Sequence, residues 1–117
     1  MDSPVVGVAA AHNAILPDAY TAAVISSVAA DAALRGARRA QTTAEAKVDA
    51  LQVQLLREHS EAQARDLVLA ERVLERTRAT VAECKADAKR SNARLARVES
   101  ELDASRGALL RVGHPVV

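Results

Sequence analysis

The sequence predicts an all-α fold in which a short N-terminal helix precedes a long coiled-coil-type helix, elongated rather than globular. Three observations support this prediction. Apolar or small aliphatic residues recur at every seventh position between residues 67 and 109, which is the period of a coiled-coil seam. Of the 117 residues, 50% are hydrophobic, yet alanine dominates and Tyr20 is the only aromatic residue. Alanine favours helix but buries little area, so long helices are expected in place of a filled globular core.

Residues 1–17 are expected to form an irregular N-terminal arm, because Pro4, Gly7 and Pro17 punctuate this stretch. Apolar chain ends generally need a partner or stay frayed. Two interpretations therefore remain open for this arm. It is either a segment that docks on a neighbouring subunit or a frayed tail.

A short apolar helix is predicted over residues 18–35. Asp18 is a good N-cap, and Gly36 is a typical residue for ending a helix. The helix is nearly apolar on all sides, so it needs cover from the long helix or from another chain.

A basic linker is predicted over residues 36–42. The arginines Arg35, Arg38 and Arg39 lie in or beside it. One interpretation is that these side chains contact a phosphate or an acidic partner. The other is that they belong to a solvated connector, where positive charge suits the C-terminal end of a helix.

The long helix is predicted over residues 43–112, followed by a C-terminal tail at 113–117. Residues 42–45 have the spacing of a capping box, and no glycine or proline follows before Gly107. Gly113 and Pro115 are typical stop signals. A helix of this length makes a rod of about 100 Å at ~1.5 Å per residue.

A break in this long helix is the competing interpretation. Residues 60–63 also have capping-box form, so the chain could stop near His59 and restart, giving three helices. The apolar stripe of Val48, Leu51 and Leu55 is also out of phase with the one that begins at Leu67. Because no glycine or proline marks the break, the unbroken helix is favoured.

The heptad seam of the long helix is the predicted association site. A strict seven-residue repeat keeps one apolar face that needs a second helix to cover it. Its other track is made mostly of small residues, which permit close approach of the two helices. The orientation of the two helices stays open. The seam residues are Leu67, Leu74, Val81, Cys84, Ala88, Leu95, Val98, Leu102 and Leu109.

No catalytic, metal or cofactor site is predicted. The single cysteine, Cys84, excludes an internal disulfide; it either meets its own copy in a parallel dimer or is a small buried residue of the seam. The histidines His12, His59 and His114 are far apart and lack neighbours at metal-ligand spacing. We therefore expect no enzymatic activity and no small-molecule substrate.

The expected function is structural. We expect a spacer, clamp or cementing subunit of a larger complex, such as a virion or a filament, that associates with itself or with a larger scaffold. The near balance of 16 basic and 15 acidic residues gives no broad attraction for nucleic acid or membranes. No stretch is apolar enough to span a membrane, so a soluble protein of a reducing compartment or of a large assembly is expected.

The alternative is a helical protein associated with nucleic acid. Residues 72–97 contain eight basic residues and three acidic ones, so a basic helix could follow a phosphate backbone. The expected contacts are the linker arginines together with Lys89, Arg90, Arg94 and Arg97. No family resemblance is specific enough to name, because coiled coils share periodicity without common ancestry.

Overall fold

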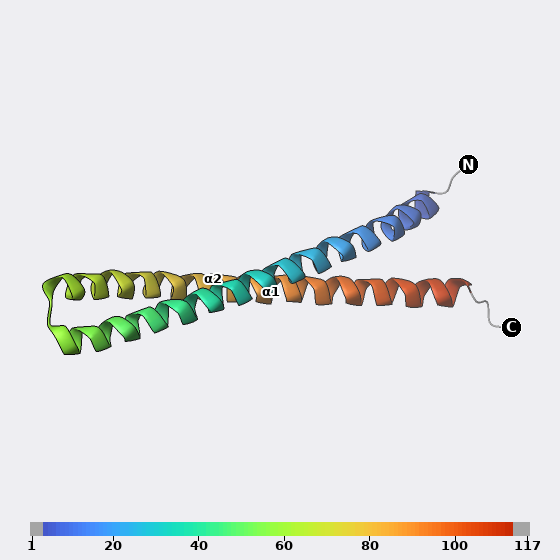
Figure 1. The fold of residues 1–117 in the computed structure, drawn as a ribbon. Coiled ribbons are helices and arrows are strands. Elements are labelled where there is room, and N and C mark those ends of the chain that lie inside the picture. The colour runs from blue at the N-terminus through green and yellow to red at the C-terminus, as the bar shows by residue number, and fades with distance from the viewer. Residues whose placement is uncertain (1–3, 114–117) are drawn as a thin grey trace. The chain divides into compact units, whose positions relative to one another are not determined.

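Two long helices joined by a short turn form the computed structural model of the chain (Figure 1). The structure describes the backbone of residues 4–113 and the side chains of residues 18–108. Helix α1 spans Pro4–Glu58, and helix α2 spans Glu61–Gly113. No strand occurs in the described part of the chain, so the predicted all-α fold class is confirmed.

The chain divides into two compact units. Unit 2, residues Ala30–Ala88, is an antiparallel helical hairpin made of the C-terminal part of α1, the turn and the N-terminal part of α2. Unit 1 combines Met1–Ala29 with Lys89–Val117. Within unit 1, the hydroxyl of Ser26 lies 3.4 Å from that of Ser91. The hydroxyl of Ser27 donates to Asn92 Oδ1, so here too α1 lies against α2.

The core of unit 2 lies between its two helices. Ala44 and Val48 of α1 and Ala70 and Leu74 of α2 are each between 5% and 8% exposed and form one apolar cluster. Leu51 and Leu67 pack against this cluster. The core is thus a single layer of side chains between two helices, without a third element.

The turn between α1 and α2 consists of His59 and Ser60. Ser60 is the N-cap of α2, because its hydroxyl accepts a hydrogen bond from the backbone N–H of Gln63 at 3.4 Å. Its carbonyl accepts from the N–H of Ala64 at 3.0 Å. The side-chain amide of Gln63 also donates to Glu58 Oε2 at 3.0 Å, which links the two helix ends.

The prediction of one unbroken helix over residues 43–112 is therefore wrong. The chain breaks near His59, as the capping-box pattern at residues 60–63 indicated, but two helices result and not three. The hairpin lets the apolar faces of α1 and α2 cover each other, which a continuous helix cannot do. No described residue has a positive φ, which explains why the turn needs no glycine.

The predicted linker at residues 36–42 is also wrong, because α1 runs through it. Gly36 has no positive φ and does not cap a helix. The hydroxyls of Thr42 and Thr43 donate to the carbonyls of Arg38 and Arg39, both at 3.1 Å. This back-bonding is typical of a helix interior and not of a new N-cap. Continuous burial of the inner face of α1 outweighs the cost of about 1 kcal/mol for one glycine.

The separate arm and short helix predicted at the N-terminus belong to α1 as well. The backbone is helical from Pro4 onward, so residues 18–35 are the middle of a longer helix and not an element of their own. Alanine-rich sequence before Pro17 favours this continuation. The side chains of residues 4–17, including His12, lie outside the described residues, as do residues 114–117 of the predicted tail.

We predict that Gly36→Ala stabilises the protein by about 0.5–1 kcal/mol, because alanine loses less backbone entropy in a helix interior. There is room for the added methyl group, since its nearest neighbour would be Arg39 Nη2 at 4.0 Å. Thermal unfolding followed by circular dichroism measures the effect. A lower melting temperature would contradict a helix that is continuous through this position.

Candidate association surfaces

The seam predicted on α2 is the face that packs on α1 of the same chain. Leu74 and Ala88 are buried, and the other described members are half-buried. The half-buried members are Leu67, Val81, Cys84, Leu95, Val98 and Leu102. The side chain of Leu109 lies outside the described residues. The chain therefore supplies its own second helix, and the described seam is not left open for another protein.

Helix α1 carries a matching seam that sequence analysis missed. Its covered positions also follow a heptad, with alanine on one track and mixed side chains on the other. The first track is Ala23, Ala30, Ala37, Ala44 and Leu51, and the second is Ser27, Leu34, Gln41, Val48 and Leu55. All of these residues are buried or half-buried. Alanine at every seventh position was the available signal, but it is hard to see in an alanine-rich sequence.

We infer that large side chains lie opposite small ones in two layers of the unit 2 core. Ala44, Val48, Ala70 and Leu74 form one cluster, and the antiparallel course of the helices pairs Ala44 with Leu74 and Val48 with Ala70. The same register places Leu51 opposite Leu67. A small residue on one helix leaves room for a large residue on the other, so the two backbones approach closely. This alternation explains how a core with so much alanine is filled.

Cys84 faces α1 of its own chain. It is half-buried with a free thiol, and continuing the heptad register from the core cluster places it opposite Leu34. In this hairpin the thiol does not meet its own copy, as it would in a parallel dimer of α2.

Polar positions interrupt the seam in both units. In unit 2, the half-buried Gln41 donates to Glu45 Oε1 at 3.0 Å, and the hydroxyl of Thr77 donates to the carbonyl of Leu74 at 2.8 Å. In unit 1, Ser27 and Asn92 contact each other between the helices. The Gln41 and Thr77 contacts are satisfied within their own helices, whereas the Ser27–Asn92 contact joins the two helices and would be lost if they slid by one heptad, so it helps to fix the register of the pair.

One flank of unit 2 carries an acidic zone near the turn. We define this acidic zone as Glu45, Asp49, Glu71 and Glu75, which line a hollow of ≈ 510 Å³ together with Gln52 and Arg78. Both helices contribute two carboxylates to it. Negative charge is therefore concentrated on both sides of the seam at the same level.

A basic zone follows on the same flank, farther from the turn. We define it as Arg35, Arg38, Arg78 and Lys85, all of which are exposed. Arg38 precedes Glu45 by one heptad, and Arg78 follows Glu71 by one heptad, so each pair shares a helix face. Charge on this flank is thus mostly sorted along the hairpin, with acid near the turn and base beyond it. Arg78 lies at the boundary, because it also lines the acidic hollow, and Asp31, one heptad before Arg38, adds one acidic residue at the far end.

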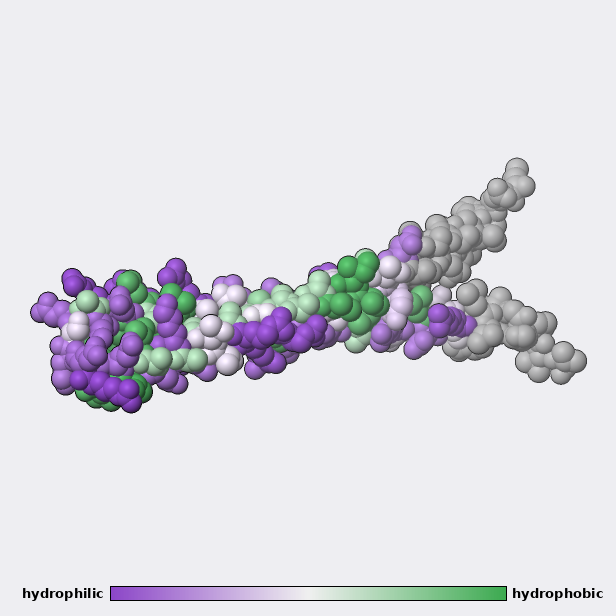
Figure 2. Space-filling view, in the orientation of Figure 1, coloured by the Kyte–Doolittle hydropathy of each residue, from purple (hydrophilic) through white to green (hydrophobic). Residues whose placement is uncertain are grey.

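Large apolar side chains remain exposed around the turn. We call Val53, Leu56, Val68, Leu69 and Val73 the turn patch; their exposed fractions run from 44% to 76%. Leu69 lines two hollows, one of ≈ 360 Å³ with Leu51 and Val73 and one of ≈ 410 Å³ with Val68. Leu56 lines a third, of ≈ 400 Å³. Figure 2 shows apolar surface at this end of the hairpin among hydrophilic side chains.

Unit 1 also exposes apolar side chains on α1. Ile25 and Val28 are 64% and 61% exposed, and Tyr20 is 36% exposed. These residues provide a natural control for experiments on the turn patch, because they are similar in chemistry and exposure.

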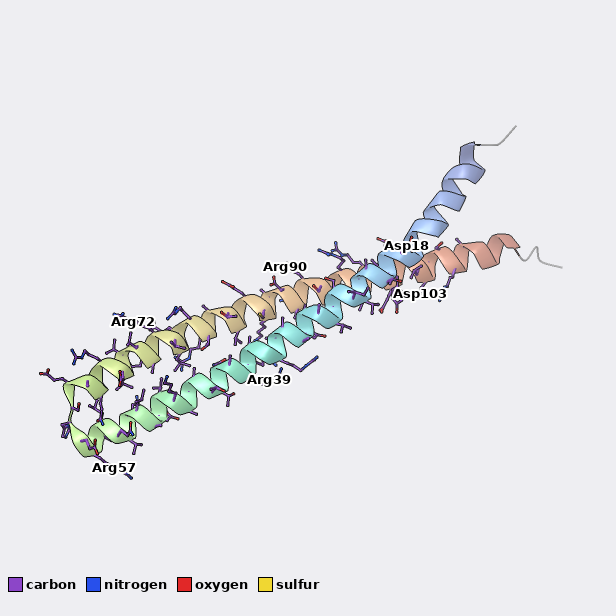
Figure 3. All side chains as sticks on the ribbon, turned by 45° about the horizontal axis from the view of Figure 1, so that its top comes forward. Asp18, Arg39, Arg57, Arg72, Arg90 and Asp103 are labelled. Atoms are coloured by element: carbon purple, nitrogen blue, oxygen red, sulfur yellow. The ribbon has the colours of Figure 1, made fainter. Side chains whose placement is uncertain are left out.

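The basic residues predicted for nucleic-acid contact belong to different units. Arg35, Arg38 and Arg39 lie on α1 in unit 2, where Arg39 points away from the helix pair (Figure 3). The others lie on α2 in unit 1 and are likewise exposed; they are Lys89, Arg90, Arg94 and Arg97. The nucleic-acid alternative stays a prediction.

Neither metal binding nor membrane insertion gains support from the described residues. No group of three or more His, Cys, Asp or Glu side chains within residues 18–108 is arranged to hold a metal ion. No helix in the part of the chain that the structure describes is long and apolar enough to cross a membrane.

The fold and surfaces define an all-α helical hairpin of coiled-coil type. Comparison with protein-family models, curated proteins and solved structures finds no match for this chain.

Proposed function

We propose that the protein is a non-enzymatic assembly protein that acts through helix–helix association, as a spacer, clamp or cementing subunit of a larger complex. The observation that supports this proposal is the turn patch. Its five large apolar side chains stay at least 44% exposed although the heptad seam is already filled within the chain. Clustered exposed apolar side chains commonly mark protein-interaction surfaces.

The geometry of the turn patch suits an apolar helix of a partner protein. Leu69 and Val73 lie one helical turn apart on α2, and Val68 is next to them. The hollows beside Leu69 can accept side chains that a partner helix presents at three- and four-residue spacing. Burying one leucine fully stabilises an interface by roughly 1.5–3 kcal/mol, so a few such contacts hold a subunit in place.

We predict that Leu69→Glu abolishes binding to the partner but leaves the hairpin folded. Leu69 is 56% exposed, so its replacement should change stability by about 0.5 kcal/mol or less. The measurement is affinity purification of the full chain from its native cells, with quantification of co-purified proteins. Circular dichroism checks that the variant is folded.

The matched control is Ile25→Glu, which places the same charge at an apolar position that is 64% exposed in unit 1. This variant should retain the partner in the same stoichiometry as the unmodified chain. If Leu69→Glu co-purifies the same proteins in the same amounts, the turn patch is not the docking surface.

A further inference from the structure

We propose that unit 2 binds a second copy of itself through the flank that carries the acidic and basic zones, forming an antiparallel four-helix bundle. This inference goes beyond the assembly function above, because it names this chain as the partner and rests on the charged zones, not on Leu69 and Val73 of the turn patch. It is carried by the way charge is sorted along that flank.

Charges of one sign face each other across the seam within a single chain. Glu45 of α1 and Glu71 of α2 line the same hollow. One heptad farther from the turn, both helices carry arginine at the corresponding positions, Arg38 and Arg78. Pairs that flank a seam usually have opposite signs when they stabilise that seam. In unit 2 the charges that face each other have the same sign. The acidic zone is therefore complementary in charge to the basic zone.

A two-fold axis perpendicular to the helices brings these zones together. Such an axis reverses the second hairpin end for end, so the acidic zone of each copy meets the basic zone of the other, twice by symmetry. The opposite orientation, with both turns at the same end, places the two acidic zones against each other and the two basic zones against each other, which charge repulsion disfavours. The charge pattern therefore specifies the relative orientation of the two copies.

A small side chain lies between the two zones on α1, where the copies would approach most closely. Thr42 lies between Arg38 and Glu45, and its side chain is exposed. On α2, the exposed Ala82 lies between Arg78 and Lys85, within the basic zone. In the proposed dimer each α1 runs antiparallel to the α1 of the other copy, and each α2 to its α2. Every helix then has antiparallel neighbours on both sides, which is the usual arrangement of a four-helix bundle.

The interface is expected to depend strongly on salt. The zones are made mainly of exposed charges, and screening shortens the range of their attraction from ~10 Å at 0.1 M salt to ~3 Å at 1 M. We therefore expect the full chain to dimerise at low salt and to dissociate at ~1 M salt, as measured by sedimentation equilibrium.

Two charge-reversal variants test the pairing. Glu45→Lys/Asp49→Lys makes the α1 part of the flank basic, and Arg35→Glu/Arg38→Glu makes it acidic. Each variant alone should dimerise at least about tenfold more weakly than the unmodified chain, because like charges then meet. An equimolar mixture should restore the dimer as a heterodimer. Circular dichroism confirms that each variant is folded.

The control is Arg76→Glu/Glu83→Lys, which reverses two exposed charges on the other flank of α2 and should leave the dimer intact. A monomer at every protein concentration at low salt would overturn the proposal. So would two reversal variants that dimerise as well as the unmodified chain. Leu69→Glu should not affect this dimer, so failure of the dimer and failure of the turn patch are distinguishable.

Discussion

Leu74→Asp is expected to unfold most of unit 2. Leu74 is 7% exposed and belongs to the apolar cluster at the core of this unit. Removing its side chain and burying a carboxylate should cost about 3–5 kcal/mol. An isolated helix gains most of its stability from packing, so loss of the core should also remove much of the helical signal in circular dichroism.

The comparison that makes this result specific is Leu69→Asp, which makes the same chemical change five residues earlier. Leu69 is 56% exposed, so its replacement should change the free energy of unfolding by about 0.5 kcal/mol or less. Equal melting temperatures for the two variants would contradict the packing of the α2 seam on α1.

The all-α fold and the seam of α2 could be predicted from the sequence because large apolar residues recur along the seam. Leucine or valine occupies most positions of one track, and a period of seven between such residues has few other physical causes. The sequence did not indicate that α1 covers this seam. The matching face of α1 mixes Leu34, Val48, Leu51 and Leu55 with alanine, serine and glutamine, and the burial of these smaller or polar residues is decided by what lies opposite and not by their own hydrophobicity.

Helix boundaries were harder to predict than helix content. Gly36 and Pro17 suggested ends that α1 does not have, and the true turn at His59 and Ser60 contains neither glycine nor proline. The capping pattern at residues 60–63 marks this turn, although no helix breaker accompanies it. The turn exists because pairing two seams stabilises the chain more than one uninterrupted helix would.

The candidate surfaces depend on the pairing of the helices, which explains why the sequence alone did not indicate them. Glu45 and Glu71 are 26 positions apart and share a hollow only because the chain reverses. Leu69 appeared to be one apolar residue among many. Its exposure becomes informative only once the seam at Leu67, Ala70 and Leu74 is seen to be filled by α1.

Exchanging a large and a small side chain across the seam is expected to restore stability that either change alone removes. Ala44→Leu should destabilise unit 2 by about 1–3 kcal/mol, because a larger side chain does not fit opposite Leu74. Leu74→Ala should cost about 2–4 kcal/mol through lost burial and a cavity. The double variant returns one leucine and one alanine to the same layer.

A double-mutant cycle measured by chemical denaturation gives the coupling between the two positions. We expect the double variant to be more stable than the sum of the single effects by about 1–3 kcal/mol. Ala46→Leu is the control for helix propensity, since Ala46 is exposed on the outer face of α1 and should tolerate leucine without loss. Strict additivity of Ala44→Leu and Leu74→Ala would mean that these residues do not face each other. The alternating large and small layers would then not explain how α1 and α2 pair.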